Sequence, residues 1–201
     1  MRKLHLLLPL ALLALVFGLA ACGGGESDED KVVDVIETSV TSSDPADCKE
    51  LATQAFLEQT ELEEGDAAVE SCEESAEDTE NDPDSVEVSE VEVDGSAATA
   101  DVAFTGGSFD GQTLSVALVE EDGDWKMDEI TGFAEFDQEK LADTFEEGLQ
   151  SGEDPLDPDL ASCFAAVLRD VPKAEAEEIV IGGSPDPIVE IIEGCSAGLG
   201  Q

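Results

Sequence analysis

The side chains able to perform nucleophilic or metal chemistry are few in this sequence. Its 201 residues include five cysteines, one histidine and no tyrosine, and the histidine is His5, close to the start. A chain without histidine beyond that point cannot assemble a Ser-His-Asp triad or a Cys-His pair. Catalysis of these two kinds is therefore excluded for everything that follows the N-terminal segment.

Carboxylates are so abundant that their spacing carries little information. Aspartate and glutamate number 51 against 8 lysines and arginines, which gives a formal net charge of −43. Any two carboxylates would match an acid–base pair by chance, so we predict no catalytic residue. Asp101 lies on the opposite face of its predicted strand from the apolar Val102 and Phe104, and we expect it to be solvated.

An acidic segment alternates as calcium ligands do, but it lacks the rest of that pattern. Its carboxylates belong to Asp78, Glu80, Asp82 and Asp84. The EF-hand loop needs Gly at position six and Glu at position twelve, and this sequence has Pro83 and Ser89 there. We therefore expect a solvated acidic loop over residues 77–85, and we predict no metal site and no cofactor.

The charge also restricts the partners of the chain. Nucleic acid binding needs clustered lysine and arginine, which this sequence lacks, so no nucleic acid is expected. The same acidity repels anionic lipid headgroups and attracts cationic partners.

The N-terminus has the layout of a secretory signal. Arg2 and Lys3 precede an apolar run over residues 6–21, and Cys22 follows the run directly. An uncleaved membrane-spanning helix is the alternative, but it needs about 18–20 apolar residues, and Pro9 interrupts this shorter run. We therefore predict a signal peptide over residues 1–21.

The end of that run resembles the lipobox of bacterial lipoproteins, in the residues Leu19-Ala20-Ala21-Cys22. The resemblance implies that the Cys22 thiol receives a diacylglycerol and that a peptidase cuts between Ala21 and Cys22. Residues 22–30 would then form a lipidated acidic tether. We expect the protein to be extracytoplasmic and attached to the cell membrane through the lipid on Cys22.

Four cysteines remain, and an even set in an exported chain predicts disulfides. They are Cys48, Cys72, Cys163 and Cys195, which allow three pairings. Helical periodicity places all four thiols on apolar faces of predicted helices, which favours a bridge within each sequential pair, Cys48–Cys72 and Cys163–Cys195. A zinc site is the alternative, and it lacks close Cys-x-x-Cys pairs and histidine.

The order of elements predicts an α+β fold. Apolar spacing and caps indicate helices near 30–41, 44–60 and from Gly65-Asp66. Period-two patterns then indicate four strands, with a bulge near Ser89-Glu90 and a hairpin at Asp94-Gly95. The expected fold class is N-terminal helices packed on a curved, cone-like four-stranded antiparallel sheet, followed by a small disulfide-linked C-terminal helical module.

Two units are expected from these elements. The α+β domain would span residues 31–150 and end with a helix over 137–150. Residues 151–201 would contain a linker and the helical module, with helices near 158–170, 173–181 and 186–196.

The helix-then-sheet order and the segment "VDGSAATADVAF…LSVALVEEDGDWKMDEI" resemble the nuclear transport factor two-like superfamily over about residues 30–137. The resemblance implies a cone with an interior pocket. We take Phe56, Val102, Phe104 and Trp125 as the candidate pocket residues. For Trp125, a place in the core is the alternative.

Three functions follow, in order of preference. The first is a non-catalytic lipid-anchored lipoprotein that binds a small apolar ligand in its cone. The second is a cell-envelope protein interaction module with a filled core, an exposed apolar patch and partners that include cationic envelope proteins. The third is a hydrolase or isomerase, which needs a buried pocket carboxylate with a raised pKa.

The lipobox generates a prediction of its own. Replacing the thiol in Cys22→Ala removes the atom that accepts the lipid, so the product should be unprocessed or released from membranes. Detergent phase partition and mass spectrometry of the wild type and the variant measure this. A lipidated, membrane-bound Cys22→Ala product would contradict the lipoprotein hypothesis.

Overall fold

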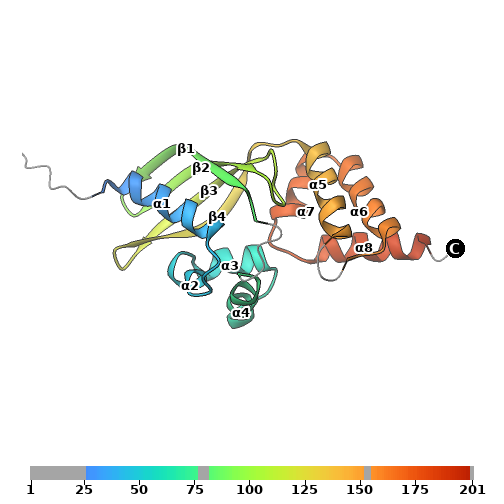
Figure 1. Ribbon diagram of the computed structural model, residues 1–201, viewed down its shortest axis with the longest axis horizontal. Coiled ribbons are helices and arrows are strands. Elements are labelled where there is room, and N and C mark those ends of the chain that lie inside the picture. Colours follow the sequence, from blue (N-terminus) through green and yellow to red (C-terminus); the bar gives the residue numbers. More distant parts are fainter. Residues whose placement is uncertain (1–25, 77–81, 152–154, 200–201) are drawn as a thin grey trace, which may run out of the picture.

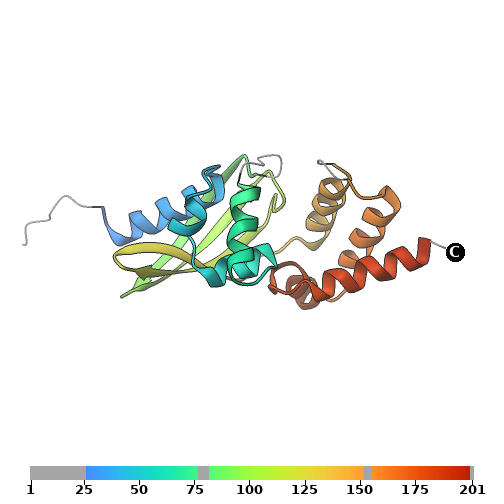
Figure 2. The same ribbon diagram turned by 90° about the horizontal axis from the view of Figure 1, so that it is seen from below.

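The computed structural model describes residues 26–76, 82–151 and 155–199. Two parts lie side by side along the long axis, a sheet covered by helices and a group of helices (Figure 1). Figure 2 shows the same two parts from below, with the last helix running to the C-terminal end. The expected α+β class with a four-stranded antiparallel sheet is confirmed. Cys22 and the acidic residues Asp78 and Glu80 lie outside the described residues.

The sheet contains four strands in sequential order, each antiparallel to its neighbour. The strands are β1 (Ser85–Asp94), β2 (Ala97–Thr105), β3 (Thr113–Glu121) and β4 (Asp124–Glu135). The predicted bulge is confirmed, because the β1–β2 register shifts between Ser89 and Glu92 and Glu90 has a φ of 50°. The bulge moves the valines that follow it back to the buried side of the sheet.

Four helices precede the sheet and cover one of its faces. They are α1 (Asp28–Thr41), α2 (Asp47–Glu50), α3 (Gln54–Glu61) and α4 (Asp66–Ser75). The expected tether over residues 22–30 is too long, because Ser27 forms a capping box with Asp30 and residues 28–30 are the first turn of α1. Val32 and Ile36, one turn apart on α1, are fully buried.

The expected continuous helix over residues 44–60 is wrong. The chain leaves the helix at Leu51–Thr53 and pairs with the edge of β4 as a short parallel bridge. The Thr53 amide donates to the Met127 carbonyl and the Met127 amide donates to the Leu51 carbonyl, both at 2.8 Å. These bonds to the strand edge replace helical ones, and the Thr53 hydroxyl then caps α3.

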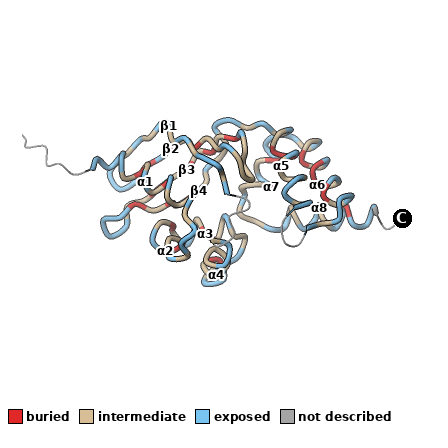
Figure 3. The backbone as a smooth tube through the Cα atoms, in the orientation of Figure 1, coloured by how far each residue is buried: buried red, intermediate tan, exposed pale blue. Residues whose placement is uncertain are grey.

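The second part begins with α5 (Gln138–Gln150) and continues with α6 (Pro158–Asp170), α7 (Lys173–Ile181) and α8 (Asp186–Leu199). The starts of α6, α7 and α8 agree with the sequence prediction. Apolar residues of α5 pack with those of α6 and α7 in a core separate from that of the sheet. The expected boundary at residue 150 therefore separates α5 from the helices it packs against. Figure 3 shows buried residues in both parts.

Both predicted disulfides are present. Cys48 of α2 is bonded to Cys72 of α4, with Cα atoms 6.1 Å apart, and Cys163 of α6 to Cys195 of α8, with Cα atoms 5.8 Å apart. Each bridge joins two helices of the same part, so each core has one covalent link.

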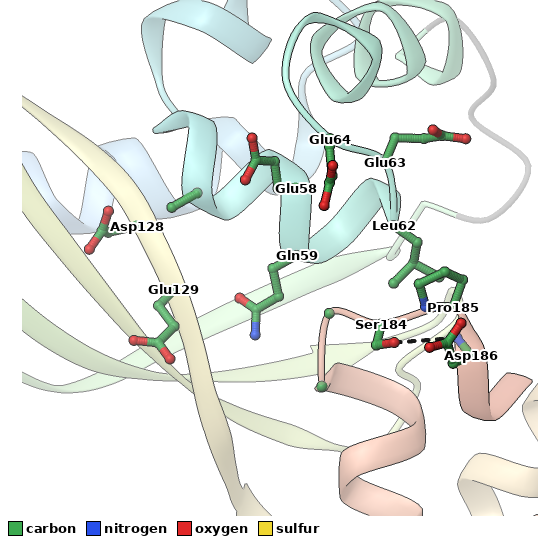
Figure 4. Close-up of a pocket in the computed structure, with 13 residues that line it drawn as sticks. Glu58, Gln59, Leu62, Glu63, Glu64, Asp128, Glu129, Ser184, Pro185 and Asp186 are labelled. Carbon is green, nitrogen blue, oxygen red and sulfur yellow. Dashed lines mark hydrogen bonds between the residues drawn. The ribbon is translucent and has the colours of Figure 1, made fainter.

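Gln59 of α3, which is labelled in Figure 4, joins the two parts through hydrogen bonds. Its side-chain oxygen accepts from the Ile130 amide at 2.8 Å, and its amide nitrogen donates to the carbonyls of Ile130 and Ile181 at 2.9 and 2.8 Å. One side chain thus bonds to β4 and to the end of α7. Gly183 has a φ of +68°, and a Cβ at this position would lie 3.3 Å from the Gln59 Cα, so a side chain there would be strained.

Loss of the second disulfide should destabilise the helical part. The double variant Cys163→Ser/Cys195→Ser frees a segment with a sequence separation of 32, and constraint of the unfolded chain is worth about 2–4 kcal/mol. Denaturant unfolding monitored by circular dichroism measures the change. The matched control is Cys48→Ser/Cys72→Ser, which removes the bridge of the other part and keeps Cys163–Cys195. An unfolding curve identical to that of the wild type would contradict this role.

Gln59→Leu should loosen the joint between the two parts. The substitution keeps the approximate volume but removes three hydrogen bonds, for an expected loss of about 1–3 kcal/mol in unfolding free energy. Hydrogen exchange at the Ile130 amide should accelerate, since that amide loses its acceptor. Gln150→Leu, at the exposed end of α5, is the control. Unchanged exchange at Ile130 would show that Gln59 is not the link.

Candidate functional site

The structure gathers the four candidate pocket residues into one packed cluster. Val102 and Trp125 are 1% and 3% exposed, and Phe56 and Phe104 are partly buried and pack against the same cluster. Phe104 also contacts Phe109, with ring centroids 5.7 Å apart. These side chains fill the space between the sheet and the helices. Trp125 therefore lies in the core, which was the alternative to a place in the pocket.

Phe56 also borders a cleft of about 410 Å³ on the helical side of the sheet. Val40, Leu57 and the Cys48–Cys72 disulfide contribute apolar surface, and Asp44 and Asp47 are acidic residues in its lining. This cleft is where a small apolar ligand would meet a residue of the predicted pocket.

Trp125 borders a different cleft, of about 690 Å³, between α1, α2 and the β3–β4 hairpin. Lys31, Lys49 and Lys126 line it with six carboxylate residues. Lys31 and Lys49 pair with Asp28 and Glu73, and Lys126 donates to the Lys49 carbonyl. The Trp125 Nε1–H is buried and makes no hydrogen bond to any described residue.

An acidic cleft of about 810 Å³ lies beside Gln59, between α3, β4 and the loop before α8 (Figure 4). No lysine or arginine is among the described residues that line it. Its carboxylates are those of Glu58, Glu63, Glu64, Asp128, Glu129 and Asp186.

Glu58 is held within this cleft by the fold. Its carboxylate accepts from the Gly65 amide at 2.9 Å and from the Gln54 side chain at 2.8 Å, and these bonds lower the pKa of Glu58. Glu58 thus stabilises the turn between α3 and α4.

The carboxylates of the described residues offer little support for acid–base chemistry. Those with a resolved change in pKa are Asp30, Glu58, Asp110 and Glu146, and every change is downward because the ionised form accepts hydrogen bonds. The buried polar side chain within the described residues is Gln112, and no carboxylate there is buried. The third hypothesis requires a buried carboxylate with a raised pKa, and the described part of the chain contains none.

Within residues 26–76, 82–151 and 155–199 there is no group of three or more His, Cys, Asp or Glu side chains arranged to hold a metal ion. None of the helices in these ranges has the length and apolar character needed to cross a membrane.

A groove of about 1110 Å³ between α7 and α8, over α6, was not predicted from the sequence. We call it the α7–α8 groove. Val189 of α8, a large apolar side chain that is 48% exposed, is not among the lining residues. The residues that line the groove are Cys163, Val167, Val171, Pro172, Ala174, Glu175, Glu178, Ile179, Asp186, Pro187, Glu190, Ile191, Gly194 and Cys195.

Comparison with known proteins gives one family match. Neither the curated proteins nor the solved structures contain a match to the chain. The family match covers the chain from α3 to β4. This region lies inside the segment that resembles the nuclear transport factor two-like superfamily, and the resemblance to that superfamily stays a prediction. Residues 57–133 are similar to the family described as low molecular weight antigen MTB12, C-terminal domain.

Proposed function

We propose that this protein is an exported, lipid-anchored, non-catalytic module that binds another protein at the cell envelope. The observation that carries the proposal is the packed core, because Val102 and Trp125 occupy the space where an interior ligand would bind. Of the three hypotheses, the interaction module is the one that expects a filled core.

The match to an antigen family supports export and names no enzymatic activity. Anchoring rests on the lipobox at Cys22, which lies ahead of the described residues. Since α1 begins at Asp28, the folded body follows shortly after the proposed lipid.

The charge supports a cationic partner. An anionic membrane surface repels the acidic body of this protein. A protein with exposed lysine and arginine is attracted to that acidic body. Attraction between opposite charges raises the rate of association. This attraction weakens as salt is added, since ions screen exposed charges beyond about 10 Å at 0.1 M.

Binding of a small apolar molecule is the second candidate, and the 410 Å³ cleft beside Phe56 is the observation that favours it. Its apolar side chains and disulfide have the character of a ligand site, although its volume is near the lower end of the range for such sites.

Chemical cross-linking in native membranes, followed by affinity capture and mass spectrometry of proteins and small molecules, tests the proposal. We expect a basic protein to be enriched in about 0.1 M salt and reduced in about 1 M salt, because exposed charges are then screened. The matched control is the Cys22→Ala variant, which should lose proximity to membrane-bound partners. A stoichiometric apolar molecule with no enriched protein would overturn the proposal in favour of the second candidate.

A further inference from the structure

The α7–α8 groove combines an apolar lining with an acidic one. Val167 of α6 and Ile191 of α8 are partly exposed in its lining, whereas Ile179 of α7 and Cys195 are buried in the core beneath. This surface belongs to three helices that meet in the helical part. An apolar groove between helices is the kind of surface that receives one face of another helix.

One face of α8 is turned toward the groove. Pro187, Glu190, Ile191 and Gly194 all line it, and their spacing of three and four residues places them on a single side of a helix. The next turn of that side of α8 continues with Gly198, which is exposed.

Gly194 is unusual for its position. It lies inside α8, where glycine destabilises a helix relative to alanine. A Cβ built on Gly194 would have no atom within 4 Å, so the described packing of the chain does not require the absence of a side chain there. A glycine that faces open space in a groove leaves room for a second backbone to approach closely.

The charged residues of the groove all have the same sign. Glu175 and Glu178 of α7 and Asp186 and Glu190 of α8 line it, and no described lysine or arginine does. A ligand that is apolar along one face and basic along both flanks would complement this arrangement. A second copy of this chain would bring further negative charge, because its net charge is −43.

We propose that the α7–α8 groove binds an amphipathic helix of a partner protein, with apolar side chains against Val167 and Ile191 and lysine or arginine on both flanks. The partner helix crosses α8 at Gly194, where the two backbones come closest. This assignment rests on the proposed function, since it names the surface and the kind of segment that the interaction module recognises.

Synthetic peptides test the complementarity directly. The probe is a helical peptide of leucine, alanine and lysine, with leucine at i, i+3, i+4 and i+7 and lysine beside that stripe. A second peptide has the same composition in scrambled order, so that charge is kept and the apolar face is lost. We expect the scrambled peptide to bind at least about tenfold more weakly by fluorescence anisotropy. Equal affinities would overturn the proposal, because binding would then be due to charge alone.

Variants of the full chain test the site. Gly194→Leu places a side chain in the groove and should weaken peptide binding at least about tenfold, while the melting temperature stays equal or rises because leucine favours a helix. Gly132→Leu, at an exposed-side position in β4 whose Cβ also meets nothing within 4 Å, is the control outside the groove. Undiminished binding by a folded Gly194→Leu variant would overturn the assignment.

The acidic flanks are tested by a matched pair of triple variants. Glu175→Gln/Glu178→Gln/Glu190→Gln should weaken binding and reduce its dependence on salt. Glu37→Gln/Glu139→Gln/Glu147→Gln removes the same charge from α1 and α5 and should leave the affinity near that of the wild type. Equal losses in both triple variants would show that only the net charge acts, which contradicts a site in the groove.

Membrane capture with the Gly194→Leu variant separates this inference from the proposed function. A partner captured equally by the wild type and the variant overturns the groove assignment but leaves the interaction function standing. Capture of no protein by either chain overturns the proposed function. A concentration-dependent dimer of the wild type that Gly194→Leu abolishes would identify a second copy as the occupant and overturn the partner-helix assignment.

Discussion

Six basic residues follow residue 21 in a chain that carries 51 carboxylates, and the fold places most of these cations where its elements meet. Lys49 pairs with Glu73 across α2 and α4, Lys140 with Asp110, and Arg169 of α6 with Asp143 and Glu146 of α5. Exposed ion pairs are individually weak, but each of these also offsets local repulsion between acidic segments of the chain. Neutral amide side chains form the hydrogen bonds at other junctions. Gln59 joins α3, β4 and α7. Gln112 donates to the Asp137 carbonyl and accepts from the Asp137 amide, and Gln138 donates to the end of α6. An ionised glutamate could not replace them, since it has no hydrogen to donate.

Much of the fold was predictable because its signals are local. Alternating valines and Asp94-Gly95 defined the first hairpin, and the helical phase of Cys48, Cys72, Cys163 and Cys195 selected the observed pairing. The helix over 44–60 failed because its apolar stripe is continuous in sequence, whereas the exposed edge of β4 competes for the backbone near Ala52. The packing of α5 against α6 could not be predicted either, because an amphipathic helix does not reveal which core it covers.

The candidate site was less predictable than the fold. The sequence correctly marked Val102 and Trp125 as inward-facing, but it could not distinguish a filled interior from a hollow one, since that depends on the packing of α1 and α3 over the sheet. The α7–α8 groove lies between two helices joined by the loop that contains Gly183, and no residue pattern specifies how those helices are oriented. A glycine inside an otherwise apolar helix, Gly194, was the available signal.

The two ends of the described chain lie at opposite ends of the molecule (Figure 1). Five residues separate Cys22 from the start of α1, and five extended residues span at most about 18 Å. A lipid on Cys22 would therefore hold the sheet-bearing end close to the bilayer, while α8 extends outward from the surface. The molecule would then stand upright on the bilayer, with its helical part presented to neighbouring proteins in the envelope. Gln59, at the joint between the two parts, would set the angle at which that outer end is held.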